Sequence, residues 1–328
     1  MKFGSSNPKT GIGLFATVAA IVVTISGAAK PVRAELLIGL TSQNSLISFD
    51  STTPGTISAP VSITGILGGD TLVGIDRRPS TGANNGFLYA FGVNTGTGAG
   101  RIYTLNTTTG LATPGFLLTA DPADTTAPTP FTTVTGTSFG VDFNPVPDRL
   151  RVTSNTGQNL RINVDNGLTQ LDVPLAYQAG DPNFGAVPVD TAVAYSNNFG
   201  GATTTTLRGV DAGMSPDLLV IHTNPNGGLL QTSLGMSFDS NPSLLAYDIS
   251  GLTGTPYFSA TPVGAGSSSL YTISGGSSTL IGTIGGGVAL RGLAAPVGVA
   301  VTAAPEPGTL ALAGLGILGL LVMRRTRE

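Results

Sequence analysis

Short apolar stretches alternate with turn-forming residues along most of the chain, from about residue 36 to residue 295. The stretches are rich in β-branched residues and Leu, and no helical periodicity of useful length lies between them. Asn-Gly pairs, which favour the tight turn of a β-hairpin, separate several of the stretches. The pattern therefore predicts hairpins with strands at residues 36–40, 45–49, 71–75, 87–91, 101–105, 150–153, 160–164, 217–222, 243–247 and 269–273.

A weak repeat indicates how these strands group into sheets. Gly-(Ile/Val)-Asp occurs at residues 74–76, 140–142 and 209–211, with a partial echo at residues 292–293. With a recurring strand that ends in a polar tail, it divides the chain into five or six units of roughly 45 residues, the size of a propeller blade. We therefore expect an all-β fold, a β-propeller-like ring of about five to six short antiparallel sheets. A β-sandwich pair or a β-solenoid is the alternative, and the ring is favoured because it protects strand edges.

Composition narrows the class of protein. Hydrophobic residues make up 41% of the chain and charged residues only 10%, so it can build a core and lacks the charge of a disordered protein. It contains no Cys, which excludes disulfides, thiolate metal sites and Cys nucleophiles. The single histidine, His222, argues against His-rich metal sites and most His-dependent triads.

Charge is distributed unevenly along the chain. All three lysines lie within the first 30 residues, and three arginines lie within the last five. Between residues 35 and 304 there are eight Arg and no Lys against fifteen Asp and one Glu, a net charge of −8. We therefore expect neither nucleic acid nor an anionic membrane surface as a partner of this region.

Residues 1–34 have the organisation of a secretory signal peptide. Lys2 and Lys9 supply the positive start, an apolar stretch follows, and Val32-Arg33-Ala34 offers the small residues that signal peptidase reads. We expect cleavage after Ala34, so that the exported chain begins at Glu35. The alternative is an uncleaved N-terminal anchor, for which the apolar stretch is barely long enough.

The C-terminal end has three parts: Pro-Glu-Pro, an uncharged run at residues 309–323, and an Arg cluster. We expect a stalk at residues 298–307 and a transmembrane helix with its Arg-rich tail at residues 308–328, the arginines remaining in the cytoplasm. The order of these parts resembles the PEP-CTERM sorting signal of Gram-negative bacteria. The matching residues are Pro305, Glu306, Pro307, Arg324, Arg325 and Arg327.

The resemblance to this sorting signal implies a route for the protein. It implies export, a transient anchor in the inner membrane, and cleavage near Pro-Glu-Pro by an exosortase-type membrane protease. Delivery to the cell surface or to the extracellular matrix would follow. The alternative is a plain C-terminal membrane anchor without sorting.

Four segments in the middle of the chain, at residues 139–152, 155–161, 194–198 and 203–211, carry a resemblance to a domain family. They are similar to the DUF4394 domain, an uncharacterised bacterial family, and the similarity extends through most of the predicted strands. The resemblance implies a propeller-like all-β domain, which we place at residues 35–297. It implies no activity that could be carried over.

Three arginines fall close together in this region. Arg149 and Arg151 are two residues apart and would point to one face of a strand, and Arg161 lies on the expected partner strand. Such a cluster can hold carboxylates or sulfates of an acidic polysaccharide by paired hydrogen bonds. We take the three as candidate ligand-binding residues. The alternative is that they pair with nearby Asp residues and tie blade strands together.

Asp76, Asp142 and Asp211 end the three copies of the repeat. If they lined a central channel they could bind Ca²⁺, which takes oxygen ligands. An Asp at a strand end more often caps a turn, so the three are weak candidates, and we predict no metal and no other cofactor. Glycoside hydrolysis needs two placed carboxylates, and fifteen Asp supply pairs by chance, so we name no catalytic residue.

These observations favour a non-enzymatic protein of the cell surface or exopolysaccharide matrix, exported with the help of signal peptidase and exosortase. Its body would bind or pack with extracellular polysaccharide. Two alternatives stay open: a propeller enzyme that acts on glycans, and a surface domain that binds a specific protein or small ligand.

Overall fold

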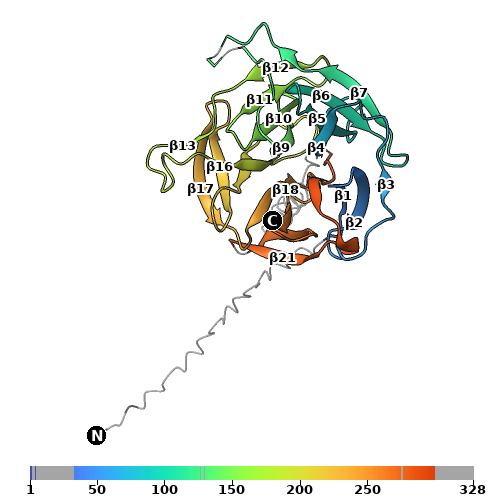
Figure 1. Ribbon diagram of the computed structural model, residues 1–328. Helices are drawn as coiled ribbons and strands as arrows, with labels where there is room; N and C mark the ends of the chain where they lie inside the picture. The colour runs from blue at the N-terminus through green and yellow to red at the C-terminus, as the bar shows by residue number, and fades with distance from the viewer. Residues whose placement is uncertain (2–3, 5–32, 126, 129, 275, 300–328) are drawn as a thin grey trace, which may run out of the picture. The chain divides into compact units, whose positions relative to one another are not determined.

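Five small β-sheets stand around a common axis in the computed structural model (Figure 1). The protein is a five-bladed β-propeller, which confirms the expected all-β ring of about five to six sheets. The expected transmembrane helix and nearly all of the expected signal peptide lie outside the described residues. In the part of the chain that is described, no helix is long and apolar enough to cross a membrane. The structure describes residues 1, 4, 33–125, 127–128, 130–274 and 276–299.

In each blade the inner strand lies at the axis, and the strands paired to it lead in order to the outer edge. Blade 1 consists of β22 (Leu290–Ala294), β1 (Leu36–Thr41), β2 (Ser45–Asp50) and β3 (Val61–Ser62). Blade 2 consists of β4 (Asp70–Arg77), β5 (Leu88–Asn94), β6 (Ala99–Leu105) and β7 (Ala112–Leu117). Blade 3 consists of β9 (Phe139–Asn144), β10 (Arg149–Ser154), β11 (Asn159–Ile162), β12 (Leu168–Leu171) and β8 (Thr119–Ala120).

Blades 4 and 5 complete the ring. Blade 4 consists of β14 (Asp190–Tyr195), β15 (Leu207–Asp211), β16 (Leu218–Asn224), β17 (Leu229–Gly235) and β13 (Ala176–Tyr177). Blade 5 consists of β18 (Ser240–Ile249), β19 (Pro256–Pro262), β20 (Ser269–Ser274) and β21 (Ser277–Thr283), and a short 3₁₀ turn, η1 (Gly285–Gly287), leads on to β22. Pairing is antiparallel except where the short strands β8 and β13 add parallel edges.

The ring is closed by pairing the two ends of the domain. In blade 1, β22 lies beside β1, with Ile38 opposite Ala294. Glu35, just before β1, is 3% exposed and reaches into blade 5. Its carboxylate accepts hydrogen bonds from Ser250 Oγ at 2.5 Å and Tyr257 Oη at 2.8 Å. The residue expected to begin the exported chain therefore fastens blade 1 to blade 5.

The hydrophobic core lies mainly between neighbouring blades. Side chains alternate along each strand, so one face of a sheet packs on the blade before it and the other on the blade after it. Between blades 2 and 3, Tyr89 meets Phe143 edge to face with ring centroids 5.3 Å apart, and Phe91 meets Phe139 at 6.2 Å. All four rings are buried, so each blade depends on its neighbours for its core.

Glycines of the sequence repeat allow the inner strands of neighbouring blades to approach closely. A Cβ on Gly74 would lie 2.5 Å from Val141 Cγ2 of blade 3. A Cβ on Gly140 would lie 3.0 Å from the backbone nitrogens of Ala192 and Val193 in blade 4. Gly209, in the third predicted copy, lies on β15 and not on an inner strand. The repeat therefore marks the axis in only two of its three copies.

Replacing Gly140 by alanine is expected to lower the free energy of unfolding by about 1–3 kcal/mol, because the backbone of blade 4 must move to admit the methyl group. Urea unfolding followed by circular dichroism measures the change. The matched control is Gly235→Ala on the outer strand β17, where a Cβ meets nothing within 4 Å. Equal destabilisation by the two variants would contradict close packing at the axis.

Candidate functional site

A broad groove of about 860 Å³ lies between blades 3 and 4. One wall is the β9–β10 turn at residues 144–147 together with Arg161 of β11, and the other is formed by residues 203–207 and 221–226 of blade 4. This volume lies within the range of about 300–1,000 Å³ typical of small-ligand sites. We call it the blade 3–4 groove.

The walls of the blade 3–4 groove present hydroxyl and amide groups beside apolar side chains, among them Val146, Leu207 and Ile221. Four successive threonines, residues 203–206, form much of one wall, and Asn224 and Asn226 follow. The threonine segment is held from behind, because Asn197 Nδ2 donates to Thr204 O at 2.9 Å and Thr205 Oγ1 donates to Ser196 O at 2.5 Å. The groove thus offers a fixed row of neutral polar groups, the kind that sugar hydroxyls can bind.

Arg151, one of the three candidate arginines, is buried beneath this groove. Its side chain is 1% exposed. Nη1 donates to Asn159 Oδ1 at 2.6 Å and to Asp172 Oδ2 at 2.7 Å, Nη2 donates to Asn226 Oδ1 at 2.7 Å, and Nε donates to Tyr195 Oη at 3.1 Å. With these partners the guanidinium joins blade 3 to blade 4 and is closed to a ligand from solvent.

The other two candidate arginines are accessible. Arg161 donates Nε and Nη2 to the two oxygens of Asp172, at 2.7 and 2.8 Å, and its side chain is 26% exposed. It lines both the blade 3–4 groove and a smaller hollow of about 170 Å³. Arg149 lines the smaller hollow too, and its Nη1 donates to the backbone oxygens of Pro147 and Asp148. The structure therefore brings Arg149 and Arg161 to one hollow, while Arg151, which shares Asp172 with Arg161, is closed to solvent.

Another arginine, Arg78, was not a candidate from the sequence, and it joins blades 2 and 3. Arg78 donates to both oxygens of Asp148, at 2.8 and 2.7 Å, and to both oxygens of Asp165, at 2.7 and 2.6 Å. These contacts hold the pKa of Asp165 below its usual value. Arg-Asp pairs that tie strands together, the alternative drawn from the sequence, thus occur at two blade junctions.

His222 lies at the base of the blade 3–4 groove, inside blade 4. Its Nε2 is 2.8 Å from Asp190 Oδ2, and both side chains are fully buried. Burial raises the pKa of Asp190, while the neighbouring imidazole lowers it. The pair connects β14 to β16 across the sheet and is sealed from the groove by its own burial.

Three aspartates meet on the propeller axis. One oxygen from each of Asp76, Asp142 and Asp248 lies within 4.8 Å of the others, and each side chain is 1% exposed. Each reaches the inner strand of the next blade. Asp76 Oδ2 accepts the Phe143 amide at 2.7 Å, Asp142 Oδ2 the Tyr195 amide at 2.8 Å, and Asp248 Oδ2 the Ala295 amide at 2.6 Å. We call these three groups the axial carboxylates.

The environment of the axial carboxylates opposes ionisation. Burial raises the pKa of Asp76 and of Asp142 well above the usual value, and the charges of their neighbours raise both further. Burial also raises the pKa of Asp248 to about 7, although the amides of Ala295 and Ile249 pull it down. Three like charges this close in a dry interior repel one another strongly.

Asp211, the third aspartate of the sequence repeat, does not join this cluster. It lies on β15, where its carboxylate accepts hydrogen bonds from Tyr177 Oη at 2.5 Å and from the amides of Val189 and Gly213. Asp248 takes its place at the axis. Asp248 follows Ala246-Tyr247 instead of Gly-Ile or Gly-Val, so the repeat could not reveal it. What the three clustered residues share is an Asp toward the C-terminal end of an inner strand, and that feature of the sequence could have identified Asp248.

The chain matches two known protein-family models, one for the propeller domain and one for the C-terminal end. A family model described as "Domain of unknown function (DUF4394)" matches residues 45–294, and a "PEP-CTERM protein-sorting motif" matches residues 303–327. The comparison with curated proteins gives no match. The sorting motif indicates an exosortase-sorted, exported surface protein.

Several solved structures are similar in outline. A chain of a nidogen/laminin complex is 8% identical, with a TM-score of 0.45, covering 80% of this chain and 98% of that one. A putative 6-phosphogluconolactonase from Bacteroides uniformis is 17% identical, with a TM-score of 0.37 and coverage of 77% and 68%. The allergen Mala s 1 from Malassezia sympodialis is 11% identical, with a TM-score of 0.39 and coverage of 75% and 74%.

Proposed function

The chain belongs to the DUF4394 family and carries a PEP-CTERM sorting motif, and from this premise we propose that it is a non-enzymatic surface or matrix protein that binds extracellular polysaccharide. Signal peptidase and exosortase would process its ends, and the body would remain outside the cell. The blade 3–4 groove is the surface that we assign to the polysaccharide.

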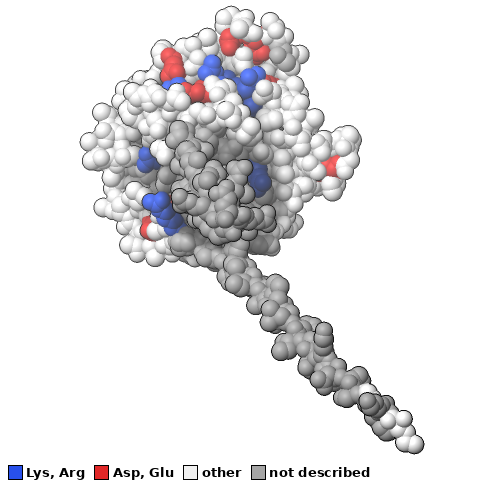
Figure 2. Space-filling model, turned by 180° about the vertical axis from the view of Figure 1, so that it is seen from behind, with Lys and Arg blue, Asp and Glu red and all other residues white. Residues whose placement is uncertain are grey.

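The observation that carries this proposal is the chemistry of the groove. Its volume suits a few sugar units, and its walls offer hydroxyl and amide groups held in fixed positions. Charged side chains are sparse on the face shown in Figure 2, in keeping with a chain in which they make up 10% of residues. Such a surface suits a neutral or weakly charged polymer better than a polyanion.

The charged groups near the groove favour the same class of ligand. Arg161 donates two hydrogen bonds to Asp172, which also pairs with Arg151, so its positive charge is partly compensated. Arg151 is closed to solvent. A strongly acidic polysaccharide would therefore find one partly neutralised guanidinium in the groove instead of the cluster of three that the sequence suggested.

Sedimentation with polysaccharide from the producing cells tests the proposal. The wild-type protein is expected to sediment with this fraction, and Thr204→Trp, which places an indole in the groove, is expected to reduce binding about tenfold. The matched control, Thr279→Trp on β21, is exposed on blade 5 and should bind as the wild type does. Absence of binding to any matrix fraction, or equal binding by both variants, would contradict the proposal.

A further inference from the structure

We propose that Asp76, Asp142 and Asp248 bind one divalent cation of the Ca²⁺ type on the propeller axis. The donors are all carboxylate oxygens, the ligands that this ion prefers. Oxygens bound to one Ca²⁺ at about 2.4 Å cannot be farther apart than about 4.8 Å. One oxygen from each of the three side chains satisfies that limit at once. The three side chains therefore meet the distance condition that a shared ion requires.

An unpartnered oxygen within the cluster points to the same ligand. Asp142 Oδ1 is buried and accepts no hydrogen bond, while Asp142 Oδ2 is held by the Tyr195 amide. Both oxygens of Asp76 and both of Asp248 accept backbone amides. Buried polar atoms in native proteins almost always have a partner. A cation would supply one to Asp142 Oδ1 where the protein supplies none.

The charge balance at the axis also favours a cation. Two positive groups lie near the cluster: Arg77, whose charge acts on Asp76 and Asp248, and Arg291, which lines the adjoining axial cavity. Arg77 Nη1 donates to the backbone oxygen of Gly86, and among the described residues no salt bridge joins Arg77 to an axial carboxylate. A divalent ion would offset the repulsion among the three carboxylates and so favour their ionised form, which the apolar surroundings alone oppose.

The amide bonds fix the orientation that a metal site requires. Five backbone N–H groups, one from the end of each of the five inner strands, hold the three carboxylates in place. Outer contacts of this kind orient ligands and are part of a functional metal site. Because the three carboxylates belong to blades 2, 3 and 5, an ion bound to them would also connect these blades.

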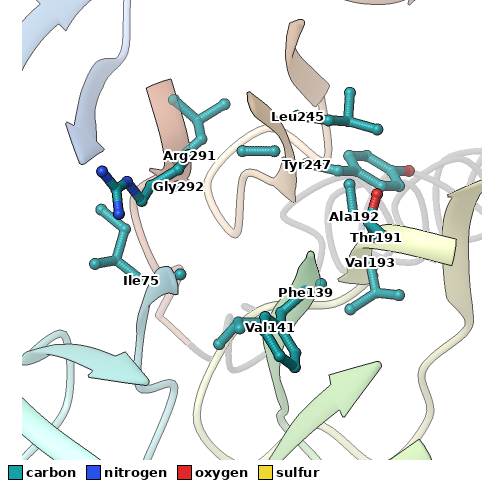
Figure 3. A pocket seen from close by; sticks show the side chains of 14 residues that line it. Ile75, Phe139, Val141, Thr191, Ala192, Val193, Leu245, Tyr247, Arg291 and Gly292 are labelled. Carbon is teal, nitrogen blue, oxygen red and sulfur yellow. The ribbon is translucent and has the colours of Figure 1, made fainter. Parts of the chain in front are cut away.

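A cavity on the axis adjoins the cluster. It is ringed by residues of all five inner strands, among them Ile75, Val141, Tyr247 and Gly292 (Figure 3). Gly74, Gly140 and Ala246 line it and precede the three aspartates by two residues, about 7 Å along a strand. Its volume of about 10 Å³ admits one water-sized particle. The cavity therefore leaves room for one water-sized particle on the axis, beside the residues that precede the three carboxylates.

The experiment measures thermal unfolding and calorimetric titration of the whole protein after treatment with EDTA. Addition of CaCl₂ is expected to raise the Tm of the wild type by about 5 °C at a 100-fold excess over Kd, with one ion bound per chain. Asp142→Asn keeps an oxygen for the Tyr195 amide and loses the charge and the free oxygen. It is expected to lose both the shift and the heat of binding.

Asp217→Asn is the matched control, because it removes a buried carboxylate that is not part of the cluster, and its response to CaCl₂ should equal that of the wild type. Asp248→Asn provides a second test of the site if Asp142→Asn does not fold. An unchanged Tm of the wild type in 5 mM CaCl₂ would overturn the proposal. So would a normal response of either cluster variant, because the ion would then be bound elsewhere.

Discussion

Replacing Arg151 by methionine is expected to lower the free energy of unfolding by about 3–5 kcal/mol. Methionine fills much of the same space but donates no hydrogen bond. The buried oxygens of Asn159, Asp172 and Tyr195, and the oxygen of Asn226 in the groove wall, would each lose a donor at 2.6–3.1 Å. Buried acceptors left without donors cost more than the hydrogen bonds contributed. Urea unfolding followed by circular dichroism measures the change.

Arg149→Met is the control that separates burial from charge. Arg149 lies two residues earlier on the same strand, and its Nη1 donates only to backbone oxygens of Pro147 and Asp148. Its replacement is expected to change the free energy of unfolding by less than about 0.5 kcal/mol. If both variants lost stability equally, or neither did, the buried network would not be what joins blades 3 and 4.

The contrast between these two arginines shows what the sequence could and could not reveal. Their spacing correctly placed them on one face of one strand, and β10 contains both. Whether that face is covered depends on Asn226 and Tyr195, which come from blade 4 and lie 75 and 44 residues away in the chain. Contacts at such separation leave no local pattern, so burial of Arg151 was beyond the sequence.

The fold was easier to predict than the site because its signals are local. Alternation and Asn-Gly turns belong to single hairpins, and each stretch predicted from them coincides with a strand of the propeller. The repeat has glycine at residues 74 and 140 for a physical reason, because a Cβ at either position would collide with the next blade. The copy at residues 209–211 satisfied the same pattern on a second strand, where Gly209 makes room for the Asp190 side chain.

The axial cluster shows how far such a repeat can be trusted. Asp76 and Asp142 were identified as possible channel residues, and the structure brings them together. The equivalent position of blade 5 holds Asp248 without the preceding glycine. Blades 4 and 1 have Ala194 and Ala294 there, directly before the Tyr195 and Ala295 amides that donate to Asp142 and Asp248. With fifteen aspartates in the chain, a three-residue motif could not show which of them occupy equivalent positions in different blades and which match the motif by chance.

Asp217 supplies a titrating group at the junction of blades 4 and 5. It is 1% exposed, and its Oδ2 accepts hydrogen bonds from the amide and the hydroxyl of Ser240, at 3.1 and 2.5 Å. Burial raises its pKa from the usual 3.8 to about 6, and the charges of Asp239 and Asp211 add to the effect. The folded state therefore binds this proton more tightly than the unfolded state does.

Stability should consequently fall as the pH rises through the window between these two pKa values. Below about pH 4 both states hold the proton and the group contributes no pH dependence; above about pH 6 the folded state carries a buried charge. Over this window the penalty reaches about 3 kcal/mol at most. Asp217→Asn keeps an acceptor for Ser240 and cannot ionise, so its stability relative to the wild type is expected to improve by up to that amount between pH 4 and pH 7.

Urea unfolding at intervals of half a pH unit, in EDTA, measures the difference. Asp121→Asn removes a carboxylate of blade 3, away from the junction of blades 4 and 5, and should follow the wild-type profile. A constant gap between wild type and Asp217→Asn across the window would show that Asp217 ionises at its usual pH.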